Sequence, residues 1–135
     1  MPSLDTNVLV RWLVQDDLRQ VSQVAALFDA SVERADELFV PITVLLETEW
    51  VLRSRYAMAP DAVARALDGV LSAPQLEVMN VDAAERALWM FKQDGAPDFA
   101  DCLHLSLAQE RDRLPWLTFE ARASRLPGWG RMPRS

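Results

Sequence analysis

Residues 3–10 read SLDTNVLV, and this stretch places an acid where a short apolar strand gives way to a helix. Thr6 and Asn7 are residue types that favour the start of a helix, and an apolar helix face follows them. In an open parallel α/β sheet, ligands bind outside the carboxyl ends of the strands. Asp5 can therefore reach a crevice shared with other strand ends, or it can serve only as the cap of the helix that follows.

The length and composition of the chain suit a single folded domain. It has 135 residues, of which half are hydrophobic, and this is enough to build a core. We see neither an internal repeat nor a second domain. We expect the domain to cover residues 1–128, and residues 129–135, which contain Pro, Gly and Arg, to form a short tail.

The charge of the chain does not indicate a general nucleic-acid binder. The net charge is −6, whereas proteins that bind a phosphate backbone usually carry a basic patch. Lys92 is the only lysine, so nearly all positive charge is arginine. Arginine suits bidentate phosphate contacts, although an arginine-rich genome explains the same composition. The local exceptions to the acidic balance are Arg53, Arg55, Arg122, Arg125, Arg131 and Arg134.

The expected location of the protein is the cytoplasm. Cys102 is the only cysteine, so no intramolecular disulfide can form, and a reducing compartment is the natural setting. The first residues do not show the charged start and apolar run of a signal peptide. No apolar stretch approaches the roughly 20 residues of a membrane span. We therefore expect a soluble protein.

Short apolar segments alternate with helical patterns along the chain. The predicted strands are residues 3–5, 38–40, 76–79 and 116–119. The predicted helices are residues 6–13, 16–34, 43–56, 60–72, 83–94 and 98–110, with a helical turn at 120–124. Thr43 and Asp82 are predicted to cap two of these helices. This alternation predicts an α/β fold with a parallel sheet that is covered on both faces and whose strand ends lie on one side.

Glu47 stands out because it lies inside a strongly apolar predicted helix without a basic partner. Its i+4 neighbour is Val51, so the carboxylate is either solvated on a free face or directed into a crevice. Glu49 is the acid expected to face solvent. It precedes Arg53 by four residues, which is the spacing of a helical ion pair.

Three further acids follow predicted turns. Asp98 and Asp101 lie three residues apart at the start of a helix, which places both on one face. Asp98 follows Pro97 and has the position of an N-cap, while Asp101 can complete a capping box or meet the helix dipole. The pair alone is therefore weak support for chemistry. Glu120 follows the last predicted strand, as Asp5 follows the first.

A cluster of carboxylates at strand ends needs a cation to offset its repulsion. Oxygen-rich clusters suit Mg²⁺ or Mn²⁺, which can activate water and stabilise the leaving oxygen of a phosphodiester. One histidine, His104, and one cysteine, Cys102, are too few for a structural zinc site, and a Ser-His-Asp triad would need His104 in mid-helix. No glycine-rich phosphate loop is present. The tryptophans predicted to be core or interface anchors, rather than base-stacking platforms, are Trp12, Trp50 and Trp89.

These segments, taken together, resemble the PIN-domain family, and within it the VapC toxins of bacterial toxin–antitoxin pairs. The matching segments are LDTNVLVR (4–11), LETEWVL (46–52), DFADCLHL (98–105) and LTFE (117–120). The Asp-Thr-Asn and Phe-Ala-Asp blocks are fairly specific, and the resemblance covers residues 4–128. It implies a three-layer α/β/α sandwich around a parallel sheet of four or five strands.

The resemblance also implies an endoribonuclease whose carboxylates hold Mg²⁺ or Mn²⁺. Asp5 and Asp101 match the principal metal ligands of the family, and Glu47 matches its helix acid. Asp98 matches an acid found in only part of the family, so its role as an N-cap stays open.

Other site positions follow from the same resemblance. Thr6, Asn7 and Thr118 correspond to polar residues that support the site. The family usually has Asp where this chain has Glu120, and a phenylalanine soon after it where this chain has residues 123–124. The longer Glu120 side chain could reach a metal or could miss it.

The partners that the resemblance implies are an RNA substrate, a second copy of the chain and a cognate antitoxin whose C-terminal segment covers the active site. Arg11 and Arg122 are candidates to contact phosphates. Two alternatives remain open. One is a PIN nuclease that acts on other RNA or on DNA outside a toxin role. The other is an inactive PIN-like module that binds a protein partner, which only Glu120 favours.

Overall fold

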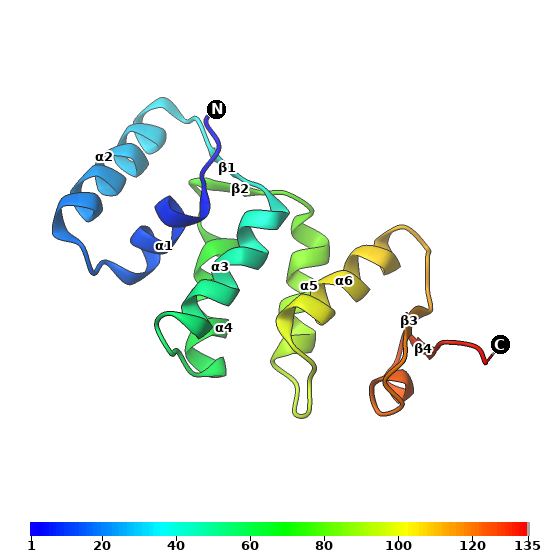
Figure 1. The fold of residues 1–135 in the computed structure, drawn as a ribbon. Coiled ribbons are helices and arrows are strands. Elements are labelled where there is room, and N and C mark those ends of the chain that lie inside the picture. The colour runs from blue at the N-terminus through cyan, green and yellow to red at the C-terminus, as the bar shows by residue number, and fades with distance from the viewer. Residues whose placement is uncertain (135) are drawn as a thin grey trace. The chain divides into compact units, whose positions relative to one another are not determined.

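The structure, a computed structural model, describes residues 1–134 and divides into two compact units. The first unit runs from Met1 to Val81 and the second begins at Asp82. Figure 1 shows the first in blue to green and the second in green to red. Each unit is described by itself.

The first unit contains four helices and two strands among its described residues. Helix α1 packs against α2 and α3, and α3 packs against α4. Trp12 of α1 stacks on Phe28 of α2, with ring centroids 4.9 Å apart. The elements are α1 (Thr6–Val14), α2 (Leu18–Arg34), β1 (Leu38–Val40), α3 (Ile42–Ser54), α4 (Pro60–Ser72) and β2 (Leu76–Val78).

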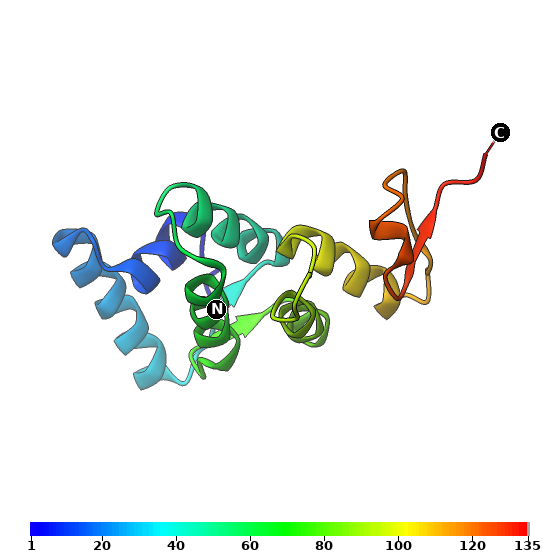
Figure 2. The same ribbon diagram turned by 90° about the horizontal axis from the view of Figure 1, so that it is seen from below.

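The strands of the first unit place Asp5 at a strand end. Strands β1 and β2 pair in parallel, with Leu38 opposite Leu76, and lie side by side in Figures 1 and 2. On the other side of β1, Ser3 forms a parallel bridge to Phe39, and the Leu4 amide donates to the Phe39 carbonyl at 2.9 Å. The predicted first strand is thus a single bridge, and Asp5 follows it directly.

The second unit carries the remaining elements. Helix α5 (Val81–Phe91) begins at the last residue of the first unit and is followed by α6 (Phe99–Glu110). The Ser106 hydroxyl of α6 donates to the Ala83 carbonyl of α5 at 2.6 Å. Strands β3 (Trp116–Thr118) and β4 (Trp129–Arg131) then pair in parallel. The short 3₁₀ helix η1 (Ala123–Arg125) lies between them in the sequence.

Several predicted boundaries were wrong. Thr43 does not cap α3, because the helix already begins at Ile42 after Pro41, whose fixed φ suits a helix entry. Asp82 lies in the first turn of α5 instead of capping it. Residues 129–131, assigned from sequence to a tail, form β4, because β3 offers them a parallel edge with which to pair.

The pairing of strands also differs from the sequence-based expectation. The part of the chain that the structure describes contains two two-stranded parallel sheets, one in each unit, whereas the sequence predicted one sheet of four or five strands. The β3 strand is not covered on both faces, since Leu117 is exposed.

No helix within residues 1–134 has both the length and the apolar character needed to cross a membrane.

Candidate active site

Asp5 caps α1 and still presents a carboxylate oxygen outward. Its backbone is extended (φ −84°, ψ 172°), and its Oδ1 accepts a hydrogen bond from the Val8 amide at 3.0 Å. The side chain is exposed, and together with Asn7 it lines a hollow of about 270 Å³ between α1 and α2. Capping uses only one of the two carboxylate oxygens, so the cap does not exclude a second role.

Thr6 joins the Asp5 junction to α3. Its side chain is buried, and its hydroxyl donates a hydrogen bond to Oε1 of Glu47. Glu47 is exposed, yet this bond ties one of its oxygens to the residue that follows Asp5. The structure therefore brings the carboxylates of Asp5 and Glu47 to the same end of α1.

Glu49 is not the solvent-facing acid that the sequence suggested. Its side chain is 2% exposed and is held by Arg53, with Nε and Oε2 2.9 Å apart. The predicted ion pair is correct, but the helix turns Glu49 inward together with Leu45 and Leu52, which are also buried. Arg53 is about half exposed and covers the carboxylate. Because Arg53 stabilises the buried Glu49 carboxylate as an ion pair, Glu49 is not a candidate metal ligand.

Asp98 and Asp101 lie at the start of α6 with their side chains unused by the helix. Asp98 occupies the cap position (φ −55°, ψ 152°), but its carboxylate forms no hydrogen bond to the first turn. The capping box considered from the sequence is therefore absent. Asp101 lies in the first turn and is half-buried. Both carboxylates remain available for another partner within this unit.

Cys102, which follows Asp101, is buried and poorly suited to act as a nucleophile. Burial, together with the negative charges of Asp101 and Asp98, raises the pKa of its thiol to about 11. His104 stacks on Trp116 with ring centroids 5.5 Å apart, so its imidazole is packed against a ring.

Glu120 and Thr118 lie together at the end of β3. The Glu120 amide donates to the Thr118 hydroxyl at 3.1 Å, which fixes the turn after the strand. The Glu120 side chain is exposed, as is that of Arg122. Thr118 thus supports the backbone that carries Glu120, within the second unit.

Arg11, a candidate for phosphate contact, is held in a network of hydrogen bonds. Its Nη1 donates to Asp16 at 2.8 Å and to the Tyr56 hydroxyl at 2.7 Å, and its Nε donates to Gln20. Tyr56 in turn donates to Asp16 at 2.9 Å. The hydrogen bond to Tyr56 raises the pKa of Arg11. No local sequence pattern predicts this network, because Tyr56 lies 45 residues from Arg11.

The donor set suits a hard cation. The candidate residues offer carboxylate and hydroxyl oxygens, which Mg²⁺ and Mn²⁺ prefer, and no sulfur or imidazole ligand stands among them. Within the described residues no group of three His, Cys, Asp or Glu side chains is close enough to hold a metal ion. The first unit contains Asp5 and Glu47, the latter bound to Thr6, and the second contains Asp98, Asp101 and Glu120.

A family model supports the resemblance seen in the sequence. Among solved structures, VapC20 of Mycobacterium tuberculosis, described as a sarcin–ricin-loop-cleaving toxin, is 18% identical over 88% of each chain, with a TM-score of 0.41. No curated protein matches the sequence. The family model of the PIN domain matches residues 3–128, which is nearly the whole chain. The protein therefore belongs to the PIN-domain family.

Proposed function

We propose that this protein is a Mg²⁺- or Mn²⁺-dependent endoribonuclease and the toxin of a toxin–antitoxin pair. Membership of the PIN-domain family supports this proposal, as does the order of the acidic segments that carry Asp5, Glu47, Asp101 and Glu120. The proposal includes a homodimer, a cytoplasmic location and an antitoxin that covers the site.

The observation that carries the proposal is the hydrogen bond from Thr6 to Glu47. It ties a second carboxylate to the residue that follows the strand-end acid Asp5, at the end of a parallel strand where α/β folds place their ligands. If Asp5 served only as a helix cap, it would not need a second carboxylate nearby. Two carboxylates held at one helix end repel each other, and a divalent cation would offset that repulsion.

In this proposal Asp5 and Asp101 bind the ion, and Glu47, Asp98 and Glu120 complete the acidic site. Thr6 orients Glu47, while Asn7 and Thr118 support the two strand ends. A divalent ion in such a site activates water and stabilises the leaving oxygen of a phosphodiester. We further infer that both units belong to one PIN domain built as a three-layer sandwich, because the family model matches residues 3–128, which span both units.

Arg122 is the better candidate for a phosphate contact. Arg11 already donates to Asp16, Gln20 and Tyr56, whereas Arg122 is exposed near Glu120. Replacing Arg122 by Ala should weaken cleavage and lower its salt dependence, because one fewer phosphate charge is neutralised. If cleavage by Arg122→Ala responds to salt like the wild type, Arg122 does not contact phosphate.

A cleavage assay with matched caps tests the proposed function. Asp5 and Asp17 cap successive helices in the same way, each accepting from a backbone amide three residues on at 3.0 Å. Asn caps a helix about as well as Asp, so both Asp5→Asn and Asp17→Asn should fold. A mixed RNA pool is incubated with Mn²⁺ or EDTA.

We expect the wild type and Asp17→Asn to cut RNA with Mn²⁺ only, and Asp5→Asn and Asp101→Asn to be inactive. Absence of cleavage by folded wild type with Mn²⁺ would contradict the proposal and favour the alternative of a PIN-like binding module. In that case Glu120→Asp tests whether the family's usual acid restores activity.

A further inference from the structure

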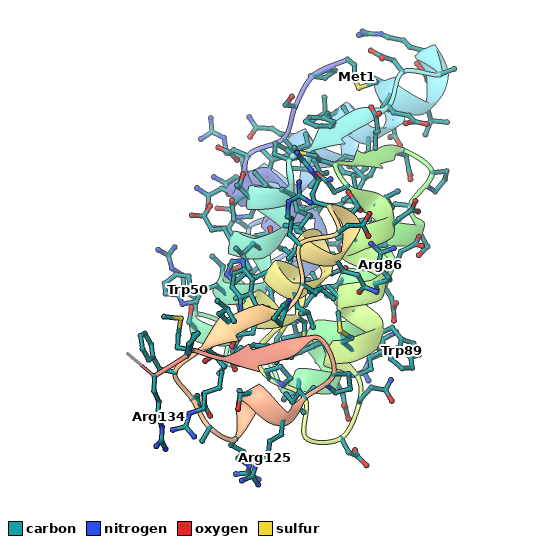
Figure 3. The ribbon with its side chains drawn as sticks, turned by 90° about the vertical axis from the view of Figure 1, so that its right-hand side faces the viewer. Met1, Trp50, Arg86, Trp89, Arg125 and Arg134 are labelled. Carbon is teal, nitrogen blue, oxygen red and sulfur yellow. The ribbon has the colours of Figure 1, made fainter. Side chains whose placement is uncertain are left out.

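We propose that Trp50 stacks on a base of single-stranded RNA next to the acidic site. This inference rests on the proposed function and names how the substrate is held. The sequence suggested that Trp50 is a core or interface anchor, but its side chain is 50% exposed and is not part of the core. Figure 3 shows it standing out from the ribbon of α3.

The position of Trp50 on α3 brings it to the candidate site. Glu47 and Trp50 are both exposed and three residues apart, so they are neighbours on one face of the helix. Glu47 is tied to the Asp5 junction through Thr6. An exposed indole therefore lies about one turn from a carboxylate of the candidate metal site.

The same helix supplies positive charge beyond Trp50. Arg55 follows it and is exposed at the C-terminal end of α3, whereas Arg53 is ion-paired with Glu49. Along the helix, the order is thus a carboxylate, an aromatic ring and a guanidinium group that is available to a phosphate. Aromatic rings with cations beside them are how proteins hold single-stranded nucleic acid, because every base has a face that can stack. A contact with an apolar protein surface would not need charged groups on either side of the aromatic ring.

A second exposed tryptophan provides the matched control. Trp89 is 65% exposed on α5, a helix without any of the candidate site residues. Both tryptophans present a free indole, but only Trp50 shares its helix face with a candidate ligand. If exposure alone caused RNA binding, replacing either tryptophan would weaken binding equally. A difference between the two variants therefore reflects the position of Trp50.

The experiment measures binding by fluorescence anisotropy in the full-length Asp5→Asn protein, which should bind RNA without cutting it. The first probe is a fluorescein-labelled single-stranded RNA of mixed sequence, and the second is an oligonucleotide of the same length made of abasic ribose-phosphate. The tested changes are Trp50→Ala, Trp50→Phe, Trp89→Ala and Arg55→Gln. The oligomeric state of each variant is checked by sedimentation.

We expect Trp50→Ala to weaken binding of the mixed RNA by about 5- to 100-fold, the range seen when a stacking ring is removed. Binding of the abasic probe should not change, and Trp50→Phe should retain most of the affinity. Trp89→Ala should bind both probes like the parent. Arg55→Gln should weaken both probes and reduce the salt dependence, because it removes a phosphate contact.

Three results would overturn the inference: unchanged binding of mixed RNA by Trp50→Ala, an equal loss on the abasic probe, or a change of oligomeric state, which would make Trp50 a contact between copies. These results are separable from failure of the proposed function. If the wild type cuts RNA while Trp50→Ala binds normally, only the stacking inference fails. If the wild type never cuts RNA but Trp50→Ala shows the base-dependent loss, only the proposed nuclease activity fails.

Discussion

At the scale of single residues, capping and metal binding are compatible roles for one aspartate. Asp5 and Asp17 each cap a helix by accepting a hydrogen bond at 3.0 Å from the amide three residues on, although their backbone angles differ. The cap of Asp5 could be predicted from sequence, because Asp-Thr-Asn before an apolar face is a local pattern. The Thr6 hydrogen bond to Glu47 joins residues 41 positions apart, so local patterns could not reveal it.

The Thr6 hydroxyl should matter for activity more than for folding. Thr6→Val keeps the shape of the side chain but removes the donor to Glu47. Residues that orient metal ligands typically contribute 10- to 100-fold in affinity or activity, and we expect a loss of about that size in Mn²⁺-dependent cleavage. Thr6→Ser, which keeps the hydroxyl, should retain most of it. Equal activity of Thr6→Val and wild type would show that this bond does not position Glu47.

The buried Cys102 thiol should be inert at neutral pH. Its pKa rises from an ordinary value of 9.0 to about 11, because burial and the nearby Asp101 charge disfavour the thiolate. The protonated form is favoured in the fold, so this contribution to stability is complete below pH 9 and is lost as the pH rises toward 11. Between these pH values the wild type should lose more stability than Cys102→Ala in urea unfolding. Parallel losses in the two proteins would argue against the raised pKa.

At the scale of elements, α3 is the helix that the sequence described least well. Its apolar residues run around much of the helix, so periodicity did not show which acid faces inward. The ion pair of Glu49 and Arg53 was predictable from its i,i+4 spacing, but the burial of Glu49 was not, because burial depends on packing against α1 and α4. The exposure of Trp50 could not be predicted for the same reason, and its role as an interface anchor stays untested.

The two partners of this ion pair should not be equally costly to remove. Arg53→Leu leaves the Glu49 carboxylate buried without this partner, and breaking a buried pair in this way costs roughly 3–5 kcal/mol. Glu49→Gln leaves a guanidinium that is about half exposed and can be hydrated, so its cost should be smaller. Urea unfolding of the two variants measures the difference. A larger loss for Glu49→Gln would contradict this account.

The helices as a set were predicted well, because each carries its own signals. Asp17 before α2, Pro60 at the start of α4 and Gly95 after α5 are local start and stop residues, and the observed bounds lie within a few residues of the predicted ones. The strands β1, β2 and β3 were also located correctly, but residues 3–5 form only a bridge and β4 was missed. The sheet that the strands form was not predicted, because a strand of three residues holds little information about its partner.

At the scale of the whole molecule, the candidate site divides between the two units. Asp5 and Glu47 belong to the first, and Asp98, Asp101 and Glu120 belong to the second. All five acids were selected from the sequence because their segments resemble a family pattern, and their role in one metal site stays a prediction.

Metal binding should therefore stabilise the whole protein. A ligand that binds only the native state of a protein raises the free energy of unfolding. The increase grows with the logarithm of the ligand concentration. Mn²⁺ should raise the melting temperature of the wild type and of Asp17→Asn, and should raise it much less for Asp5→Asn. A melting temperature that does not respond to Mn²⁺ would remove the support for a metal site.

The most direct test of the central claim is a calorimetric titration of Mn²⁺ into the wild type, Asp5→Asn, Asp101→Asn and Asp17→Asn. If Asp5 and Asp101 bind the same ion, each of these two substitutions alone should weaken Mn²⁺ binding by more than tenfold, and Asp17→Asn should bind like the wild type. Wild-type affinity in Asp101→Asn would contradict the account, because the ion would then belong to the first unit alone.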